Sequence, residues 1–337
     1  MRLLGIESSC DECSAAVVDD GRRILSNIVL SQVDFHKPWY GVVPEIASRK
    51  HIEWIRPVVE DSLREAGTTG KDIDAVAVTF RPGLIGSLLV GLSFAKGLAW
   101  ALDKPLVGVD HILAHLYAPH LERDIEYPYI GLLVSGGHTI IARVERHDMI
   151  EVLGTTIDDA CGEAFDKVAK FYDIGFPGGV AIDRLSKTGN PRAFRFPRPS
   201  LHKGEAFYDV SYSGLKTAVI HQSEQFWDGK SEKSIANIAA SFQKAAIDIL
   251  ADRALAAAED TGLRRIVAGG GVAANSYLRE RMAGQQGIEV IFPSLKLCTD
   301  NAAMVAGFGY HALREGRVSD FSLNAEARVS MFKRKYP

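Results

Sequence analysis

Short apolar runs bounded by polar turns recur along the chain, and they fall into two similar sets. Residues 2–31 (RLLGIESSCDECSAAVVDDGRRILSNIVLS) read as strand, polar turn, strand, turn and strand, and residues 129–156 (YIGLLVSGGHTIIARVERHDMIEVLGTT) repeat that order. A strand followed by an apolar helix comes after each set, at residues 74–102 and at residues 264–282. The pattern predicts an α/β protein built from a duplicated hairpin-plus-α/β unit.

The length of the chain predicts two lobes, because 337 residues exceed what one ordinary core needs. Charges, Pro128 and tyrosines interrupt the apolar periodicity at residues 121–129, so the linker is expected there. We expect an N-terminal lobe over residues 1–125 and a C-terminal lobe over residues 126–305. A C-terminal helix and tail over residues 306–337 are expected to return to the N-terminal lobe.

This duplicated order resembles the two-lobed architecture of actin, hexokinase and the heat-shock ATPases. We therefore expect an actin-like, hexokinase-like ATPase fold with a cleft between the lobes, and a nucleotide in that cleft. The chain lacks the G-x-x-x-x-G-K-[ST] motif of P-loop enzymes, and its glycine-rich turns lack the G-x-G-x-x-G spacing of dinucleotide-binding proteins. A nucleotide would have to be held by closure of the lobes.

Charge and cysteine content narrow the setting in which the protein works. A net charge of −3 gives no overall basic surface, so any RNA contact is expected to be local or shared with a partner. Four scattered cysteines are too few for a disulfide framework, and the first residues lack a signal-peptide pattern, so a cytoplasmic protein is expected. Residues 83–102 are apolar, but Lys96, glycines and serines interrupt them, which favours a buried helix and no membrane contact.

Two histidines one helical turn apart are the first candidates for chemistry. His111 and His115 lie in the apolar run VDHILAHLYAPH, and a helix there would place both imidazoles on one face. Asp300, at the start of an apolar helical run in LCTDNAAM, is the best candidate for a third ligand, and this donor set suits Fe(II) or Zn. The alternative is that backbone carbonyls satisfy the histidines. A zinc protease would need Glu directly after the first histidine, where this chain has Ile112.

Glycine-rich turns follow two of the predicted strands. LLVSGGHT at residues 132–139 can present backbone amides to an anion, and an ordinary glycine hairpin is the alternative. VAGGGVAANSYLRE at residues 267–280 follows a strand and is expected to open a helix near Asn275. DDACGEAFDK at residues 158–167 holds four carboxylates in one amphipathic stretch, for which we favour a functional site over a solvated helix face.

Cationic and aromatic residues alternate in two places. RAFRFPRPSLHK at residues 192–203 belongs to a Pro- and Arg-rich loop insertion expected at about 190–214, and FKRKYP at residues 332–337 forms the tail. Such interleaving is typical of proteins that read single-stranded RNA, and solubility is the alternative explanation. CDEC at residues 10–13 lies in a predicted hairpin turn, where neither redox nor metal use is expected.

Ten motifs taken together resemble one known family. In chain order they are GIESSCDE, GVVPEIASRKH, PGLIGSLLVG, HILAH, LLVSGGHT, DDACGEAFDK, FPGG, SYSGLK, GGGVAAN and CTDNAAM. With these motifs the chain resembles the tRNA N6-adenosine threonylcarbamoyltransferases over nearly its full length. The resemblance implies an acyltransferase that moves the threonylcarbamoyl group from threonylcarbamoyl-AMP to N6 of adenosine 37 in tRNAs reading ANN codons, which is t6A37 formation.

The resemblance also implies a metal site, a substrate site and partners. One divalent metal, Fe(II) ahead of Zn, is expected on His111, His115 and Asp300, where it would bind the adenylate phosphate, and a Mg-nucleotide is a further candidate ligand. The implied partners are the tRNA, a shorter paralogous subunit that lacks the metal site, and a small P-loop ATPase. The implied substrate-binding residues are Leu133, Val134, Ser135, Gly136, Gly137, Asp166, Gly179, Asp183 and Asn275. Glu12 and Lys216 are candidates for proton transfer or for orienting the carbamate.

The chain departs from the family pattern at three positions. Leu113 stands where an acidic residue is frequent, Cys13 where Thr is usual, and Arg81 precedes a Pro-Gly turn, where we expect it on the surface. His120 is a spare candidate ligand, but Pro119 is expected to end the helix and turn it away. Three other functions stay open: a metalloprotease that cleaves glycoproteins, a sugar kinase or ATPase of the same fold, and a non-catalytic scaffold.

Overall fold

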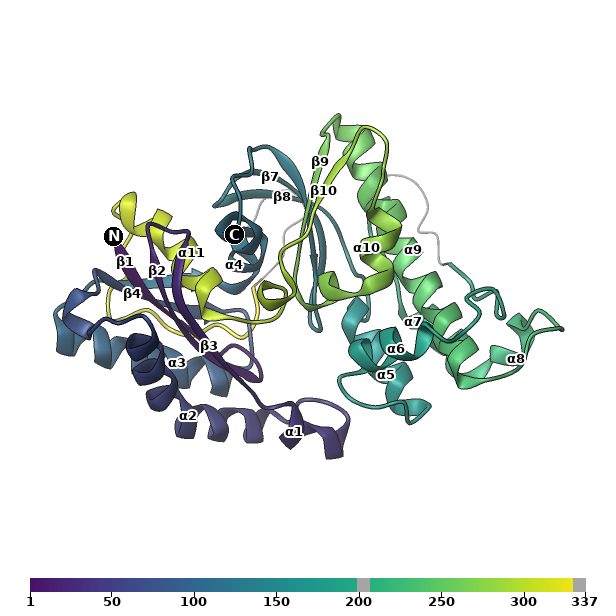
Figure 1. Cartoon of the computed structure of the whole chain (residues 1–337), viewed down its shortest axis with the longest axis horizontal. Coiled ribbons are helices and arrows are strands. Elements are labelled where there is room, and N and C mark those ends of the chain that lie inside the picture. The colour runs from purple at the N-terminus through teal and green to yellow at the C-terminus, as the bar shows by residue number, and fades with distance from the viewer. Residues whose placement is uncertain (199–206, 330–337) are drawn as a thin grey trace. The chain divides into compact units, whose positions relative to one another are not determined.

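The computed structural model describes residues 1–198 and 207–329, which divide into two compact units (Figure 1). Unit 1 comprises Met1–Ile125 together with the described residues from Pro293 onward, and unit 2 comprises Glu126–Phe292. The first division falls within the linker expected at residues 121–129. The second lies before Pro293 instead of at residue 305, because the segment that follows packs on the sheet of unit 1.

Unit 1 is built on a five-stranded sheet in the order β3-β2-β1-β4-β5. The first three strands form an antiparallel meander, whereas β4 and β5 run parallel to β1, as expected when helices connect them. The strands are β1 (Arg2–Glu7), β2 (Glu12–Asp19), β3 (Arg23–Ser31), β4 (Ala75–Arg81) and β5 (Leu106–Asp110). The helices are α1 (Val33–His36), α2 (Pro44–Glu65), α3 (Ile85–Leu102), α4 (His111–Tyr117) and α11 (Ala302–Arg314).

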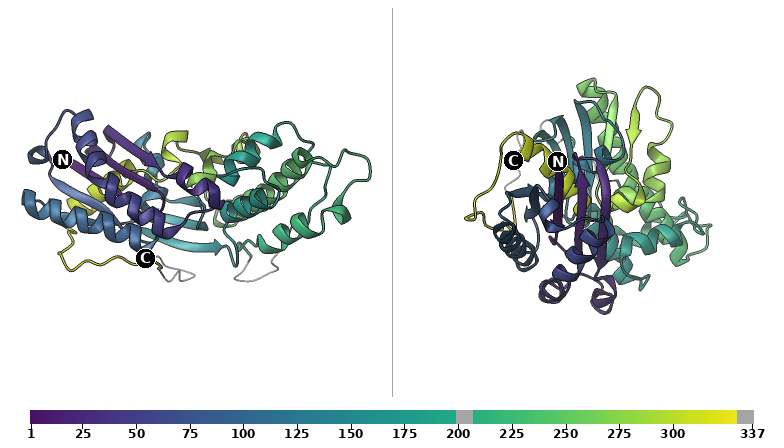
Figure 2. Two further views of the ribbon diagram at one scale, coloured as in Figure 1. Left: turned by 90° about the horizontal axis from the view of Figure 1, so that it is seen from below. Right: turned by 60° about the vertical axis from the view of Figure 1, so that its left-hand side comes forward.

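Helices cover both faces of this sheet, which explains why its central strands are apolar on both sides. Leu4 and Ile6 of β1 share a core with residues of α2 and α3, and these two helices lie side by side (Figure 2). The alternate positions face α11, where Leu3 lies beside Gly309 and Gly5 lies beside Ala302.

Gly5 sets the distance between β1 and α11. A Cβ atom on Gly5 would lie 2.3 Å from the carbonyl oxygen of Ala302 and 2.8 Å from the backbone nitrogen of Ala306. The N-terminus of α11 is also held by Ser14, whose Oγ accepts a 2.9 Å hydrogen bond from the Ala302 nitrogen. These contacts fix the start of α11, and with it the preceding Asp300, on the sheet of unit 1.

Unit 2 repeats the topology of unit 1. Its five-stranded sheet has the order β10-β9-β6-β7-β8, with an antiparallel meander from β6 to β8, while β9 runs parallel to β6 and β10 parallel to β9. The strands are β6 (Tyr129–Val134), β7 (Thr139–Arg146), β8 (Met149–Thr155), β9 (Arg265–Gly269) and β10 (Glu289–Ile291). The helices are α5 (Cys161–Phe171), α6 (Gly178–Ser186), α7 (Ser213–His221), α8 (Ser223–Phe226), α9 (Ile235–Thr261) and α10 (Ser276–Met282).

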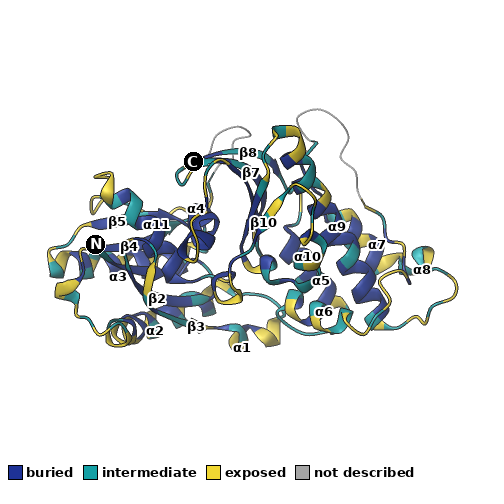
Figure 3. Cartoon of the chain, turned by 45° about the horizontal axis from the view of Figure 1, so that its top comes forward, coloured by how far each residue is buried: buried dark blue, intermediate teal, exposed yellow. Residues whose placement is uncertain are grey.

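The long helix α9 forms the centre of unit 2. It packs against α6, α7 and α10 as well as β6, β7 and β9, and it is buried along most of its length (Figure 3). The matching strand orders of the two sheets confirm the duplicated hairpin-plus-α/β unit that the sequence predicts.

The apolar segment at residues 83–102 is only partly the buried helix that we expected. It forms α3, whose buried face packs on β4, while Ile85, Leu89 and Trp100 are exposed on the other side. Among the described residues, α3 is the one helix long and apolar enough to cross a membrane. A single helix of this kind is weak evidence for a membrane, because core helices of soluble proteins meet the same criteria.

The packing of β1 against α11 predicts that Gly5→Ala destabilises the fold. The added methyl group meets backbone atoms, so the free energy of unfolding is expected to fall by at least about 1–3 kcal/mol in urea titrations. Gly97→Ala is the matched control, because Gly97 is exposed within α3 and a Cβ there meets nothing within 4 Å. The control should gain about 0.5–1 kcal/mol from its higher helix propensity. Equal effects of the two substitutions would contradict the tight approach of α11.

Candidate functional site

The two histidines lie at the start of the short helix α4, directly after β5. Asp110 ends β5 and caps α4, because its Oδ1 accepts hydrogen bonds from the nitrogens of Ile112 (2.9 Å) and Leu113 (3.3 Å). The spacing of four residues puts His111 and His115 on one face, with ring centroids 4.5 Å apart. The predicted helix over these residues is therefore present.

Asp300 reaches both imidazoles from the residue pair that precedes α11. Its Oδ1 lies 2.9 Å from Nε2 of His115 and 3.6 Å from Nε2 of His111. One donor atom from each of the three residues falls within a 4.8 Å span, and both histidines are buried. Asp300 belongs to unit 1, so it does not come from the second lobe, to which the expected boundary at residue 305 assigned it.

Glu7 is a fourth member of this cluster that the sequence analysis did not single out. Its fully buried carboxylate lies 3.0 Å from Nδ1 of His111, and it accepts hydrogen bonds from the Thr79 hydroxyl (2.7 Å) and the Ser9 nitrogen (2.5 Å). A carboxylate on the far nitrogen of a histidine fixes the ring and leaves its other nitrogen for a metal. The available signal was a charged residue at the end of the apolar strand β1.

The charges of the cluster are strongly linked. Burial acts to lower the pKa of His111, but the carboxylates of Asp300 and Glu7 outweigh it and raise this pKa to about 9. Burial acts to raise the pKa of Glu7, yet the charge of His111 holds it below its ordinary value. For His115, burial and the charge of His111 lower the pKa. A cation bound by His111, His115 and Asp300 would therefore take the place of the proton on His111.

The chemistry of the donor set fits a divalent metal ion. Two imidazole nitrogens and one carboxylate suit Zn or Fe(II), and three protein ligands leave coordination positions for oxygen atoms of a substrate. The Glu7 contact supplies the outer-shell partner that metal-bound histidines usually have. His111, His115 and Asp300 thus form a candidate metal-ligand group.

Arg81 supports the helix that carries the histidines. Its Nε lies 3.1 Å from the carboxylate of Asp110, and its Nη1 lies 3.2 Å from that of Glu326. Arg81 is less exposed than expected, because its side chain is 21% exposed and its partner Asp110 is 4% exposed. The C-terminal segment also bonds β4 directly, from the Glu326 nitrogen to the Phe80 oxygen at 3.0 Å.

The predicted substrate-binding residues lie in unit 2, on β6 and the turn after it, on α5 and α6, and at the start of α10. Leu133 and Val134 are buried at the end of β6, and the turn that follows, residues 135–137, exposes Gly136 and Gly137. The start of α5 packs on this turn, since a Cβ on Gly162 would lie 2.8 Å from the Cα of Gly136.

Hydrogen bonds connect the remaining predicted residues of unit 2. Asp166 accepts a 2.7 Å bond from the nitrogen of Gly178, next to Gly179. Asp183 of α6 accepts a 2.7 Å bond from the Ser276 hydroxyl, and Asn275 caps α10 through the Leu278 nitrogen (2.9 Å). The side chains of Asp166, Asp183 and Asn275 thus bond groups at the starts of α6 and α10.

The two candidates for proton transfer have different surroundings. Glu12 begins β2 in unit 1, and burial together with the carboxylates of Asp11 and Asp300 raises its pKa well above the ordinary value. Lys216 of α7 lies in unit 2 and is ion-paired with Asp159. Only Glu12 is therefore placed beside the candidate metal-ligand group.

Other sequence candidates take structural roles. His120 is buried and stacks on Tyr117, with ring centroids 5.1 Å apart, and it is not part of the candidate metal-ligand group. Cys10 and Cys13 are free thiols, and Cys13 lies within β2 instead of in the expected hairpin turn. Leu113, where the family often has an acidic residue, is part of the core.

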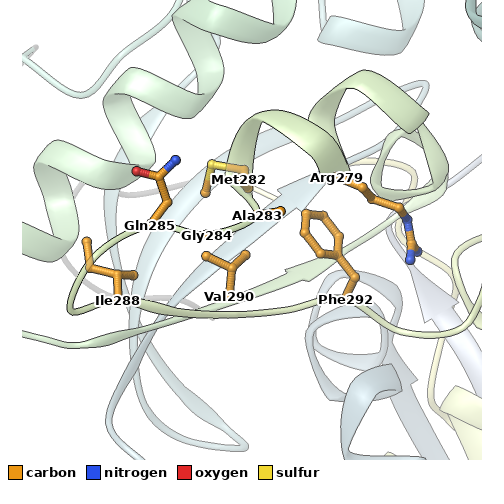
Figure 4. A pocket seen from close by; sticks show the side chains of 8 residues that line it. All are labelled: Arg279, Met282, Ala283, Gly284, Gln285, Ile288, Val290 and Phe292. Carbon is orange, nitrogen blue, oxygen red and sulfur yellow. The ribbon is translucent and has the colours of Figure 1, made fainter.

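One hollow of unit 2 contains none of the predicted residues. It lies at the end of α10 beside β10, with a volume of about 220 Å³, and Met282, Ile288 and Phe292 line it together with Arg279 (Figure 4). The guanidinium of Arg279 lies 4.9 Å from the centre of the Phe292 ring. The hollow holds no carboxylate, histidine or cysteine, so it is no candidate for the reaction centre.

Comparison with known proteins identifies the family. Residues 23–307 match the family model TsaD, described as tRNA N6-adenosine threonylcarbamoyltransferase. The chain belongs to this family. It is therefore a transferase that attaches a threonylcarbamoyl group to N6 of adenosine in tRNA. The metalloprotease interpretation has no support in these matches, and Ile112 still occupies the position where a zinc protease has its Glu.

Curated relatives agree with this assignment. The chain is 64% identical to the tRNA N6-adenosine threonylcarbamoyltransferase of Treponema denticola, over 99% of both chains. It is 53% identical to that of Borreliella burgdorferi, over 100% of this chain and 96% of the relative.

Two solved structures share the fold. Full-length HypF matches with a TM-score of 0.61 and 15% identity, over 93% of this chain and 46% of HypF. Component A of the (R)-2-hydroxyglutaryl-CoA dehydratase of Acidaminococcus fermentans matches with a TM-score of 0.56 and 14% identity, over 93% of this chain and 99% of the other. Together with the two repeated sheets, these matches confirm the actin-like α/β ATPase fold.

The geometry of the cluster predicts which substitutions lower the metal content of the protein. His111→Ala and Asp300→Asn each remove one donor. The iron or zinc content of the purified variants should therefore be at least about tenfold lower than that of the wild type. Metal is measured by mass spectrometry after gel filtration. His120→Gln is the control, because His120 is equally buried but lies outside the group. A His111 variant with full metal content would contradict the site.

The position of Arg81 predicts a loss of stability in Arg81→Gly. This substitution removes the ion pair between Arg81 and the nearly buried Asp110 carboxylate, and we expect the free energy of unfolding to fall by about 1–2 kcal/mol. Arg64→Ala is the control, because Arg64 forms an exposed pair with Asp61 that is worth at most about 1 kcal/mol. Thermal unfolding distinguishes the two variants, and equal melting temperatures would argue against a supporting role for Arg81.

Proposed function

We propose that this chain transfers the threonylcarbamoyl group from threonylcarbamoyl-AMP to N6 of adenosine 37 in tRNAs that read ANN codons. Membership of the family supports the chemical class and the tRNA substrate. The observation that carries the proposal is the buried convergence of His111, His115 and Asp300 on one point, because a nucleotidyl leaving group needs a fixed positive charge.

The reaction joins an amine to an already activated acyl group. The N6 nitrogen attacks the carbamoyl carbon of threonylcarbamoyl-AMP, the bond from that carbon to the phosphate oxygen breaks, AMP leaves, and N6 loses a proton. An anhydride of this kind needs no further activation, so the protein has to hold the phosphate, exclude water and direct a weakly nucleophilic amine.

We infer that a divalent ion, Fe(II) ahead of Zn, is held by His111, His115 and Asp300. When bound, such an ion acts as a Lewis acid that attracts the adenylate phosphate and the charge of departing AMP. Glu7 supports this assignment, because its contact with Nδ1 leaves Nε2 of His111 directed at Asp300. Asp110 and Arg81 keep α4 in place beneath the two rings.

We propose that loops of unit 2 bind the nucleotide portion of the donor, with a Mg-nucleotide as a further candidate ligand. A Cβ atom on Gly136, Gly137 or Gly179 would meet nothing within 4 Å, so a ligand can approach the backbone there. Asp183 and Asn275 support these loops by holding the start of α10.

The identity of the residue that accepts the proton from N6 stays a prediction. Lys216 is an ammonium paired with Asp159, and an ammonium has no lone pair with which to accept a proton. Glu12 is the better candidate for a role beside the phosphate, since it lies near Asp300.

We propose that the protein works in the cytoplasm with a shorter paralogous subunit and a small P-loop ATPase. Four free cysteines among the described residues support a reducing compartment. Exposed apolar side chains on α2 and α3 support a protein partner on unit 1, because Ile52 is 65% exposed and Trp100 is 76% exposed.

The proposal predicts the outcome of a reconstituted transfer assay. The protein is incubated with the paralogue, the ATPase, unmodified tRNA and threonylcarbamoyl-AMP, and the modified nucleoside is measured by mass spectrometry. His111→Ala should lower the rate at least about 100-fold, because charge stabilisation of the leaving group is lost. His120→Gln should keep most of the rate. Product that is undiminished in the His111 variant would count against the role of the metal, and absence of product from wild type would count against the donor.

A further inference from the structure

A basic pocket lies in unit 2 beside α9, and it contains none of the residues assigned to the reaction. Its volume is about 490 Å³, within the range of ligand-binding sites. Four cationic side chains and one carboxylate line it: Arg192, Arg195, Arg198, Lys244 and Asp228. The pocket is thus strongly positive in a protein whose net charge is −3.

The segment that carries the three arginines is fixed along one face of α9. The Asn190 nitrogen donates to Oδ1 of Asn237 at 2.6 Å, and the Phe194 nitrogen donates to the Ser241 hydroxyl at 3.1 Å. Asn237, Ser241 and Asp248 follow one another along α9 at intervals of one and two helical turns. Asp248 holds the far end of the arginine segment through its ion pair with Arg198. The arginines therefore project from a backbone that is already ordered.

The arginine segment also pairs like a strand with residues 226–227, and this pairing decides which of its side chains face the solvent. The Arg195 nitrogen donates to the Phe226 oxygen at 2.7 Å, and the isolated bridge between Phe194 and Trp227 continues this pairing. Phe194 and Phe196 are buried and stacked, with ring centroids 5.5 Å apart, while Arg195 is exposed.

Burial of these rings corrects the interpretation of this segment as a reader of single-stranded RNA. Phe194 and Phe196 are 4% and 6% exposed, so neither can stack on an unpaired base. Their burial leaves the arginines as the groups that can meet a ligand, and arginine suits phosphate because its planar fork donates two parallel hydrogen bonds. The other predicted RNA segments, residues 199–203 and the tail at 332–337, lie outside the described residues.

Two of the four cations lie outside the ion pairs of the described part of the chain. Arg198 and Lys244 both pair with Asp248, which is 4% exposed. Arg192 and Arg195 are exposed, and the one charge effect between them and the described carboxylates is that Arg195 helps to lower the pKa of Asp228. The carboxylate of Asp228 accepts hydrogen bonds from the nitrogens of residues 230 and 231, so it caps its own turn.

We propose that this pocket binds the phosphodiester backbone of the substrate tRNA, with Arg192 and Arg195 as the contacting residues. The inference rests on the tRNA-modifying function and adds the surface that meets the RNA. Phosphate contacts position a nucleic acid without reading its sequence, which suits an enzyme that accepts several tRNAs. A local patch of this kind also allows a chain of net negative charge to bind RNA.

The test compares two double variants of the full-length protein. Arg192→Ala with Arg195→Ala removes the two exposed arginines of the pocket, and Arg23→Ala with Lys71→Ala removes two charges from exposed positions of unit 1. Binding of an unmodified tRNA transcript is measured by filter retention over a series of salt concentrations. The pocket variant should bind tRNA roughly tenfold more weakly than the wild type. The slope of the logarithm of its binding constant against the logarithm of the salt concentration should be shallower by about 0.7–0.9 for each lost phosphate contact.

Steady-state transfer in the reconstituted system gives the second measurement. The pocket variant should raise the KM for tRNA and leave kcat at saturating tRNA unchanged, and Arg195→Lys should lie between it and the wild type because charge remains without the fork. Unchanged tRNA affinity in the pocket variant overturns the inference, as does an equal loss in the control variant. Failure of the wild type to transfer at all would speak against the proposed donor alone, since the difference in tRNA affinity is measured without the reaction.

Discussion

The arrangement of charges around His111 constrains much of unit 1. This imidazole lies between the fully buried carboxylate of Glu7 and the carboxylate of Asp300, and each of the three sits on a different element. Two buried carboxylates repel each other unless a positive charge lies between them, so the cluster is stable only when it holds a proton or a cation. The ends of β1, β5 and the residues before α11 must therefore meet at one place.

Close packing of glycine brings these ends together. Gly5 lets α11 approach β1 until backbone atoms meet, and the start of α11 then carries Asp300 to the histidines of α4. On the other side, Asp110 caps α4 and is itself held by Arg81, which also bonds the C-terminal segment through Glu326. The site is thus supported by main-chain contacts and buried charge, and the long side chains add only the final orientation.

The two units share one topology but carry different residues at corresponding turns. Carboxylates flank the turn between β1 and β2, with Glu7 at the end of β1 and Glu12 at the start of β2, whereas the corresponding turn between β6 and β7 carries Gly136 and Gly137. Carboxylates favour a cation, whereas exposed glycine backbone favours approach by a ligand that can accept hydrogen bonds from amides. The same topology therefore supplies a candidate metal site in one unit and candidate nucleotide-binding loops in the other.

Local pattern in the sequence predicted the elements and the nearest-neighbour geometry. The spacing of His111 and His115 fixed their common helical face, and the repeated strand-turn-strand order fixed the duplicated sheets, because both depend on the regular periods of backbone structure. The pattern did not reveal Glu7 as the partner of His111 or Arg81 as the partner of Asp110, because these pairs are 104 and 29 residues apart in the chain. It also could not show that Asp300 belongs to the first unit or that Phe194 and Phe196 turn inward, since burial depends on which helix packs on which strand. Sequence thus determined the elements and the types of donor, and tertiary packing alone decided which charges share a buried space.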